Sequence, residues 1–524
     1  MLKDYPDVKT SKLLYEGFSF GFFLHYEGPR EATDCVNLAS LKEKENIAFD
    51  IALKEISLGR LAGPFDQRPL PNLRLSPVGL VPKKDGTYRL IHHLSHPEGS
   101  SVNDFIPNKF CTVQYASFDN ALSILAKLGR GSIAVRLDIK SAFRLLPVHP
   151  SDFDLLGYKI MDKYFVDKCL PFGCSISCSL FEKFSTFLEW YFCLTYDCDN
   201  VIHYLDDFLI ASYTMSECKS LISNFELMCK NLGVPLATEK TIGPASVITF
   251  LGLEIDTNKM CVRIPEEKLS RLKVELEGLL NKKKATLREL QSVTGLLNFC
   301  TRAIPPGRSF LRRFYDAMTG LYKPYHKVRV NSNLREDIRV WLTFLDLYNG
   351  VYKYDLYEWN DASDLNLYTD SAGSSHLGCA AIFVTEWVFF QWPVQWRHTP
   401  LMRDITFLEL VPIVLAIHIW GSILENKRII LNTDNNALVA ILNKKSSKSK
   451  RVMRLIRPLV LHCLVHNIQI KASHIQGKSN VIADSLSRLQ WSKFFKSFPQ
   501  ADVLPRPIPQ SFLQAICNVE REKS

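Results

Sequence analysis

Several features that would assign a compartment or a protein class are missing from this sequence. Its 14 cysteines contain no Cys-x-x-Cys pair, and the usual spacings of zinc ligands do not occur. Residues 1–10 carry charges and a proline where a secretory signal would be apolar. The longest apolar stretch, 408–424, is interrupted by Glu409, Pro412 and His418, which argues against a transmembrane helix. We therefore expect a cytoplasmic or nuclear protein that is not secreted, has no membrane partner and keeps its thiols reduced.

Internal repeats and low-complexity tracts are also missing. With 47% hydrophobic and 23% charged residues, the composition is that of folded proteins and excludes a mostly disordered chain or a coiled-coil rod. A length of 524 residues is too great for one hydrophobic core, so several domains are expected. The excess of 64 Lys and Arg over 54 Asp and Glu gives a net charge of +10, which permits a polyanionic partner without requiring one.

The pattern of apolar residues predicts three successive kinds of structure. The first part is rich in short β-runs, including a hairpin over 78–92 with a basic tip and a second hairpin whose first strand is 249–256. A helical part follows, and from about residue 365 the predicted order is three strands, a helix, a strand, two helices, a strand and a helix. The proline-containing tail after Trp491 is expected to be loosely ordered. These patterns predict an α/β and α+β multidomain protein.

Two adjacent carboxylates stand between two apolar predicted strands, in Tyr204-Leu205-Asp206-Asp207. The segment could be a solvated type I turn, since Asp is common in such turns. A separate predicted strand, 132–139, has Asp138 at its end. Carboxylates at neighbouring strand ends supply the oxygen ligands that magnesium prefers, and two such ions can clamp the attacking and leaving oxygens of a phosphoryl transfer.

The order of motifs around these acids resembles the palm of reverse transcriptases. The similar segments are Leu137-Asp138 through Phe143, Leu170-Pro171-Phe172-Gly173, Tyr204-Leu205-Asp206-Asp207, Lys240 and Phe250-Leu251-Gly252-Leu253. The upstream Lys83-Lys84-Asp85-Gly86-Thr87-Tyr88-Arg89 resembles the fingers hairpin that grips the incoming triphosphate. Over the wider sequence, the chain most resembles the polymerases of DIRS-type retrotransposons, the group that uses a tyrosine recombinase.

The resemblance implies a catalytic role for the acids of this region. Asp138, Asp206 and Asp207 would be the metal-binding catalytic carboxylates, and the backbone carbonyl of Ile139 would also reach a metal. The implied cofactors are two Mg²⁺ ions in each active site, with Mn²⁺ as an alternative.

The resemblance also implies roles for basic residues. Arg89, together with Lys83 or Lys84, would neutralise the phosphates of the incoming dNTP, and the sequence leaves the choice between the two lysines open. Lys240 would act as a general acid for the release of pyrophosphate, or would simply be a surface lysine.

Four further residues belong to the substrate side of the same motifs. Phe143 would lie under the sugar and clash with a 2′-hydroxyl, which implies selection of deoxynucleotides; the alternative is a core aromatic residue. Phe172 stands where retroviral enzymes carry glutamine, so a hydrogen bond from that amide is missing. Gly173 and Tyr204 are counted with these substrate-binding residues.

A second set of acids is spread over the C-terminal part. Each alone resembles an ordinary surface residue, but two lie at predicted strand ends and two on predicted helices. In the predicted topology they can converge into one site suited to two-metal hydrolysis. The four acids are Asp370, Glu409, Asp434 and Asp484.

The order of these four acids resembles ribonuclease H. The resemblance implies that His474 assists product release or proton transfer, the alternative being a surface histidine. Asn480 would orient the substrate strand or cap the last helix. Residues 282–284, three lysines between predicted helices, are either a solvated loop or a contact to a duplex. A basic run resembles a substrate-gripping protrusion that contacts hybrid phosphates, with the cations Lys444, Lys445, Lys448, Lys450, Arg451, Arg454 and Arg457.

The sequence thus predicts a right-hand polymerase followed by a ribonuclease H-like domain, which copies retroelement RNA into DNA and cleaves the RNA of the hybrid. The expected segments are an N-terminal extension 1–70, fingers and palm 71–265, thumb and connection helices 266–360, a ribonuclease H-like domain 361–490 and a tail 491–524. The expected partners are an RNA template, a DNA primer, their hybrid and dNTPs. Two other hypotheses remain: a nucleic-acid-binding remnant without catalysis, and a template-independent polymerase whose second set of acids does not converge.

Overall fold

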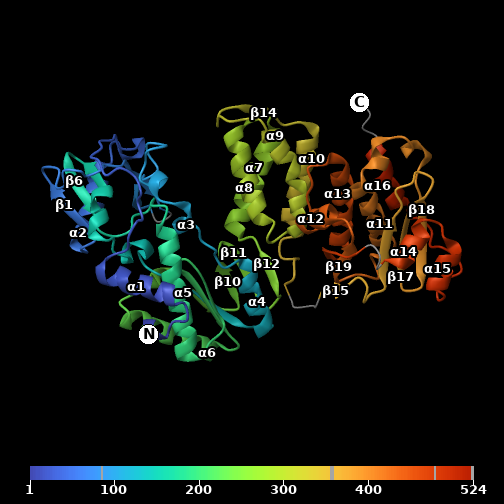
Figure 1. Cartoon of the computed structure of the whole chain (residues 1–524), viewed down its shortest axis with the longest axis horizontal. Coiled ribbons are helices and arrows are strands. Elements are labelled where there is room, and N and C mark those ends of the chain that lie inside the picture. Colours follow the sequence, from blue (N-terminus) through green and yellow to red (C-terminus); the bar gives the residue numbers. More distant parts are fainter. Residues whose placement is uncertain (84–85, 355–358, 477–479, 521–524) are drawn as a thin grey trace. The chain divides into compact units, whose positions relative to one another are not determined.

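The computed structural model describes residues 1–83, 86–354, 359–476 and 480–520, and Figure 1 traces the chain through them. The chain divides into two compact units. The first comprises residues 1–251 and 255–260, and the second comprises 252–254 and 261–524. Among the helices in these described ranges, none is long and apolar enough to cross a membrane.

The first unit is built on a four-stranded antiparallel sheet with the order β7-β8-β4-β9. Helices α4, α5 and α6 pack against its strands. Val135, Leu137, Phe208 and Ile210 from the sheet join side chains of α5 and α6 in one buried cluster. The elements are α4 (Phe118–Leu128), β4 (Ile133–Asp138), α5 (Ser177–Tyr196), β7 (Val201–Tyr204), β8 (Asp207–Ser212), α6 (Met215–Asn231) and β9 (Ile242–Ala245).

The N-terminal segment is part of this unit's core. Leu14, Phe22 and Leu24 are buried in the same cluster as the central sheet. A three-stranded sheet, β1-β6-β5, and the predicted hairpin of β2 and β3 complete the unit, and the antiparallel register of that hairpin confirms the prediction. The elements are α1 (Val8–Phe20), α2 (Glu45–Ser57), β1 (Leu61–Phe65), β2 (Val78–Pro82), β3 (Tyr88–His92), α3 (Asn108–Cys111), β5 (Gly157–Ile160) and β6 (Lys163–Asp167).

The expected single strand 249–256 is wrong, because the structure divides it into β10 (Val247–Phe250) and β11 (Leu253–Asp256). Leu251 and Gly252 between them have positive φ angles of 46° and 80°. Two successive left-handed residues cannot continue an extended strand. The run of apolar residues concealed this break, because hydrophobicity does not report backbone handedness. β12 (Cys261–Arg263) follows.

The second unit begins with helices and a short strand pair. Thr286 and Glu289 form a capping box at the start of α8, which fixes where this predicted helix begins. Leu290, Val293 and Leu297 are buried and form an apolar stripe along this helix. The elements are α7 (Glu266–Asn281), β13 (Lys284–Thr286), α8 (Leu287–Cys300), α9 (Arg312–Met318), β14 (Lys327–Arg329) and α10 (Ser332–Leu347).

An α/β layer structure follows in the predicted order. An antiparallel set β16-β17-β18 and a parallel set β15-β19-β20 surround the apolar helix α11, which packs against β16, β17 and α13. Residues 362–366 form a turn that separates β15 from β16. The elements are β15 (Asn360–Asp361), β16 (Leu367–Ser371), β17 (Gly378–Phe383), β18 (Glu386–Gln391), α11 (Ile405–Trp420), β19 (Arg428–Thr433), α12 (Asn436–Lys444), α13 (Lys450–Val465), β20 (Gln469–His474) and α14 (Val481–Ser487).

The tail is more ordered than its prolines suggest, so that expectation is wrong. It forms α15 (Trp491–Ser497) and α16 (Gln510–Glu520). Phe494 is buried with Trp387 in one cluster, and Phe512 is buried in the cluster that contains α11. Burying large aromatic side chains stabilises the docked tail by about 1.5–3 kcal/mol each, which outweighs the helix-breaking effect of prolines that lie between the helices.

Candidate active sites

The first acidic cluster lies at one end of the central sheet of the first unit. Asp138 ends β4 and is directly opposite Asp207 at the start of β8. Asp206 precedes Asp207 in the β7–β8 turn, and its carbonyl accepts a 2.9 Å hydrogen bond from the Ile139 N–H. The strand register therefore brings together three acids that are separated in sequence. Leu205 in the same turn has a positive φ of 54°, which costs energy for a branched residue.

A buried ion-pair network supports this turn. The Leu205 N–H donates a 3.1 Å hydrogen bond to Glu182 Oε2 of α5. Glu182 Oε1 also lies 3.3 Å from His203 Nε2, and Glu189 Oε2 lies 2.5 Å from His203 Nδ1. Burial lowers the pKa of His203, but the hydrogen bonds to Glu182 and Glu189 outweigh this and raise it to about 9. A charged histidine between two carboxylates therefore fixes the strained residue of the turn.

The protein's own cations neutralise part of the first cluster. Lys240 Nζ lies 2.8 Å from Asp138 Oδ1, and Arg136 Nε lies 3.3 Å from Asp207 Oδ1. Asp206 has no such partner in the described ranges. Burial, and then the charges of Asp138 and Asp207, raise its pKa to about 6.

The residues expected on the substrate side come together beside the β2–β3 hairpin. The Arg89 guanidinium lies over the Phe172 ring at 4.6 Å, and the Phe143 ring is 5.3 Å from that of Phe172. Gly173 has a φ of 117°, and a Cβ there would come within 2.0 Å of the His92 carbonyl, so only glycine fits. Arg89 is exposed and Phe143 is half-buried.

The structure describes Lys83 at the hairpin tip and Tyr204 before the acidic turn, two residues expected to contact the substrate. Lys83 is exposed, and its N–H donates to the Thr87 carbonyl across the hairpin at 2.7 Å. Lys84 lies outside the described residues. Tyr204 is half-buried, and its ring lies 4.7 Å from that of Tyr115, which the sequence did not indicate.

The second acidic cluster lies in the second unit. Asp370 of β16 accepts a 2.6 Å hydrogen bond from Ser487 Oγ, and Glu409 of α11 accepts a 2.8 Å hydrogen bond from Ser371 Oγ. Burial, and then the charges of Asp484 and Asp434, raise the pKa of Asp370 to about 7.

Burial also raises the pKa of Glu409, to about 8, with Asp370 and Asp434 adding to the effect. Asp484 accepts a 2.6 Å hydrogen bond from Arg488 Nε. The four acids are therefore close enough to perturb one another, as a converging cluster requires.

Asn480 and His474 border this second cluster. Asn480 Nδ2 donates a 2.8 Å hydrogen bond to the Thr369 carbonyl of β16, while its side chain makes no capping bond to α14. Of the two roles considered for Asn480, helix capping is therefore not observed. His474 ends β20 opposite Thr433, the residue before Asp434, and is exposed.

Both clusters consist of oxygen donors, which suits a hard cation such as Mg²⁺. Within 1–83, 86–354, 359–476 and 480–520, no three His, Cys, Asp or Glu side chains are gathered closely enough to hold an ion as they stand. In the structure Asp138 contacts Lys240, and Asp370 accepts a hydrogen bond from Ser487. The donor set fits magnesium.

Comparison with known families identifies the first unit. A family described as "Reverse transcriptase (RNA-dependent DNA polymerase)" matches residues 81–255, which include the first acidic cluster. Residues 81–255 form a reverse transcriptase domain.

Curated relatives extend the similarity beyond this reverse transcriptase domain. The genome polyprotein of Petunia vein clearing virus is 22% identical over 390 residues, which cover 74% of this chain and 17% of the polyprotein. The Tf2-7 transposon polyprotein of Schizosaccharomyces pombe is 22% identical over 433 residues, which cover 79% and 29%. The chain therefore spans less than a third of the length of either relative.

Solved structures with the same fold confirm the expected multidomain α/β and α+β architecture. A foamy viral protease-reverse transcriptase in complex with double-stranded DNA has a TM-score of 0.51 and 16% identity, covering 90% of this chain and 79% of that one. The foamy viral protein in complex with an RNA/DNA hybrid has a TM-score of 0.50 and 14% identity, covering 97% and 63%.

The basic run that follows the reverse transcriptase domain is only partly available to a ligand. Arg457 Nη2 lies 2.8 Å from Asp337 Oδ2, a buried carboxylate of α10, and the Arg457 guanidinium lies 5.4 Å from the Phe310 ring. The expectation that Arg457 contacts nucleic acid is therefore wrong, because its charge is used inside the protein. Four members of the run are exposed: Lys444, Lys448, Lys450 and Arg451.

Part of the lysine run 282–284 also makes contacts within the protein. Lys282 Nζ lies 2.7 Å from Glu289 Oε1, and Lys284 lies in β13, which pairs with β14. Lys283 is exposed.

Sequence reasoning missed the residues that position both clusters. Glu182 and Glu189 lie seven residues apart on the same face of a largely apolar helix, and this spacing was the available signal. Ser487 lies three residues after Asp484, on the same side of α14. Serine is so common on helix surfaces that its position alone carries little information.

Proposed function

We propose that this chain is an RNA-directed DNA polymerase with ribonuclease H activity, from a retroelement of the DIRS type. The observation that supports this most strongly is the presence of two separate acidic clusters, one in each compact unit, the first at strand ends and the second shared between strands and helices. The first lies within the segment that matches the reverse transcriptase family. We assign fingers and palm to 71–265, thumb and connection to 266–360 and the ribonuclease H-like domain to 361–490, flanked by the extension 1–70 and the tail 491–524.

In the polymerase site, Asp138, Asp206, Asp207 and the Ile139 carbonyl would hold two Mg²⁺ ions. These ions would lower the pKa of the primer 3′-hydroxyl and neutralise the departing pyrophosphate. Burial and the neighbouring acids raise the pKa of Asp206, and a bound cation would lower it again by favouring the ionised carboxylate. The strained Leu205, held by Glu182, keeps Asp206 and Asp207 in a fixed orientation.

Other residues of this unit would bind and select the nucleotide. Arg89 and either Lys83 or Lys84 would bind the triphosphate, and Phe143 would exclude a ribose 2′-hydroxyl. Phe172 and Gly173 form the surface beside Phe143, and Tyr204 precedes the acidic turn. Lys240 would protonate the departing pyrophosphate after its ammonium has left Asp138.

In the ribonuclease site, Asp370, Glu409, Asp434 and Asp484 would hold two Mg²⁺ ions that activate water and stabilise the leaving 3′-oxygen. Ser487 and Ser371 orient Asp370 and Glu409 by hydrogen bonds. His474 would exchange a proton with the product, a role to which an imidazole side chain is suited. Asn480 joins the start of α14 to β16 and would position the RNA strand next to Asp484.

The proposed partners are an RNA template, a DNA primer, their hybrid and dNTPs. The foamy viral structures contain double-stranded DNA and an RNA/DNA hybrid, which supports this choice. The excess of positive charge is compatible with such polyanions.

The test is a pair of assays on the full chain. With Mg²⁺, the protein should extend a DNA primer on an RNA template using dNTPs, and should cleave the RNA strand of an RNA/DNA hybrid while leaving double-stranded RNA intact. A metal chelator should stop both reactions. Loss of both activities with retained hybrid binding would indicate a catalytically dead remnant, and extension without hybrid cleavage would refute the ribonuclease assignment.

A further inference from the structure

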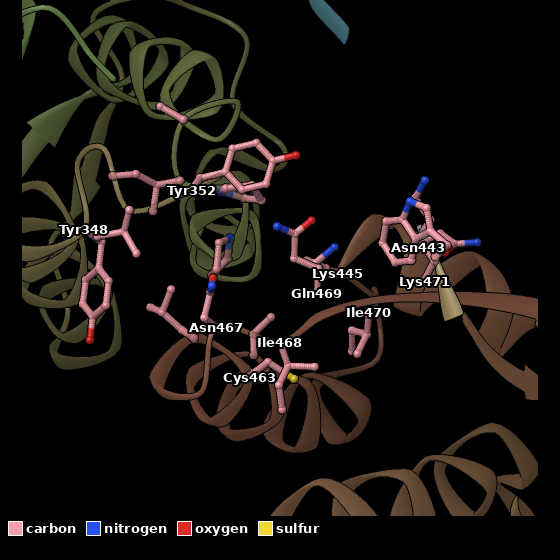
Figure 2. A pocket seen from close by; sticks show the side chains of 18 residues that line it. Tyr348, Tyr352, Asn443, Lys445, Cys463, Asn467, Ile468, Gln469, Ile470 and Lys471 are labelled. Atoms are coloured by element: carbon pink, nitrogen blue, oxygen red, sulfur yellow. The ribbon is translucent and has the colours of Figure 1, made fainter. Parts of the chain in front are cut away.

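A pocket of about 350 Å³ lies in the second unit, outside both acidic clusters. It is bordered by residues 303–306 after α8, by the loop after α10, by α13 and by the start of β20. Figure 2 shows Tyr348 and Tyr352 entering from one side, and Cys463 and Ile468 from the other. The volume is near the lower end of the roughly 300–1,000 Å³ typical of small-molecule sites.

The charged side chains that line the pocket are all positive. Its lining contains Lys445 and Lys471 and no Asp or Glu. Within the described ranges, no side chain or carbonyl pairs with the Lys445 ammonium. An ammonium without a counter-ion in a half-buried position is costly, and an anion that enters the pocket would relieve this cost.

The backbone fixes Lys445 at the pocket wall. Lys445 follows the last residue of α12 with a left-handed φ of 52°, and its N–H donates to the Ile441 carbonyl. Its own carbonyl accepts a 2.7 Å hydrogen bond from Ser309 Oγ. Burial, and to a smaller extent the charges of Arg308 and Lys471, lower the pKa of Lys445. The lysine is therefore preorganised at this position.

The rest of the lining favours a planar ligand. Trp359 lines the pocket with the Lys471 ammonium 4.3 Å from its ring, and Tyr348 and Tyr352 add two more rings. Aromatic walls bind flat molecules by stacking.

The amide side chains of the lining already have protein partners. Asn443 exchanges two hydrogen bonds with the backbone of Ala472, and Gln469 Nε2 donates to the Lys353 carbonyl. They therefore add polarity to the wall without presenting a hydrogen-bonding pattern that would distinguish one base from another.

We propose that this pocket binds one nucleoside monophosphate unit, with the phosphate at Lys445 and the base against the aromatic residues. The unit is either a free nucleotide or the 5′-phosphorylated end of an RNA strand, since both present the same planar base and the same anion. The site shares no residue with the acidic clusters, so the proposal stands or falls independently of the proposed polymerase and ribonuclease activities.

The test is calorimetric titration of the full-length protein, in a metal chelator, with AMP and with adenosine as the uncharged control. AMP should bind saturably and adenosine more weakly. Lys445→Met should weaken AMP binding roughly tenfold to hundredfold, the range for removal of a hydrogen bond to a charged group. Lys496→Met is the control, because Lys496 is exposed and is not part of the pocket lining, and it should bind AMP like the wild type.

A second variant keeps the proposal testable if Lys445→Met is unstable. Gln469→Glu changes the size of the side chain little and places a negative charge in the lining, so it should abolish AMP binding by repelling the phosphate. Absence of saturable AMP binding to the wild type, or equal affinity in wild type, Lys445→Met and Gln469→Glu, would overturn the proposal.

The source of the ligand is distinguished with tetraribonucleotides that carry either a 5′-phosphate or a 5′-hydroxyl. If the 5′-phosphate improves binding and the gain disappears in Lys445→Met, the pocket receives the end of a strand. If AMP binds through Lys445 but the 5′-phosphate gives no gain, the ligand is a free nucleotide.

Discussion

The two acidic clusters neutralise their negative charge in different ways. In the first, fixed cations contact two of three acids, because Lys240 pairs with Asp138 and Arg136 with Asp207. In the second cluster, Asp370 and Glu409 accept hydrogen bonds from serine hydroxyls. Burial, together with the charges of neighbouring acids, raises their pKa values further, to about 7 and about 8, against about 6 for Asp206.

The difference indicates what a metal ion must displace at each site. At the first cluster an incoming cation competes with the ammonium of Lys240 at Asp138 and with the guanidinium of Arg136 at Asp207. At the second cluster it competes with protons on Asp370 and Glu409. We therefore expect the second site to depend more strongly on pH when magnesium is limiting.

The largest expected effect is the loss of one activity, primer extension or hybrid cleavage, while the other is retained. Asp206→Asn should lower primer extension about a thousandfold, corresponding to roughly 4 kcal/mol for loss of a charged metal ligand, and should leave hybrid cleavage intact. Asp434→Asn should do the reverse. The measurement is single-turnover extension and cleavage by the same preparations.

A common effect of either variant on both reactions would contradict this separation. Thermal melting provides the control, since both asparagine variants should remain at least as stable as the wild type without metal.

The next largest effect concerns the selection of deoxynucleotides beside the first cluster. Phe143→Ala should admit ribonucleotides, raising their incorporation efficiency relative to deoxynucleotides by about tenfold or more, or about 1.4 kcal/mol in transition-state binding. Cleavage of the hybrid should not change. An unaltered ratio would leave Phe143 as a packing residue between Phe172 and Phe181.

A smaller effect tests whether protons neutralise the second cluster. The folded-state pKa of Glu409 is about 8, above its ordinary value of 4.5, so its contribution to stability is present at low pH and is lost as pH rises from about 4.5 to about 8. Without metal, Glu409→Gln should therefore match wild type at pH 5 and exceed it at pH 8. The gain should be about 1 kcal/mol or more, roughly 2–4 °C in melting temperature.

Magnesium should reduce this gain, because it binds the native wild-type site preferentially. A Glu409→Gln variant that melts at the wild-type temperature at pH 8 in chelator would show that Glu409 is ionised without cost.

The smallest effect concerns how the second unit holds its substrate. Replacing the exposed Lys448, Lys450 and Arg451 by methionine should weaken hybrid binding for all sequences alike. The slope of log affinity against log salt should fall by about 0.7–0.9 for each phosphate that the variant no longer neutralises. The exposed Lys3, Lys9 and Lys12, replaced in the same way, provide a control of equal charge, and an equal change in both triple variants would assign the effect to net charge.

The sequence predicted features that depend on strand ends and helix periodicity. Asp138 and Asp207 were expected to meet because each terminates an apolar strand, and their register confirms this. The helical part after the second hairpin was expected from its apolar pattern, and the structure forms α7 and α8 there. Such features depend on residues within a few positions of one another, which a sequence displays directly.

The remaining features depend on partners far away in sequence. Arg457 was expected to face nucleic acid, but its partner Asp337 lies 120 residues upstream. The support of Leu205 by Glu182 depends on how α5 packs beneath the turn, and the break at Leu251 depends on backbone handedness. Charge, hydrophobicity and spacing do not encode these tertiary choices.

The Arg457–Asp337 contact limits how the chain can be divided. A fragment excised at residue 361 would keep the four acids of the second cluster but lose α10, leaving the Arg457 guanidinium without its carboxylate. Breaking a buried pair on one side typically costs about 3–5 kcal/mol, a large share of a domain's stability. Excision at residue 261 would retain both partners. Transfer of the second acidic cluster to another protein would therefore be expected to require the preceding helices as well.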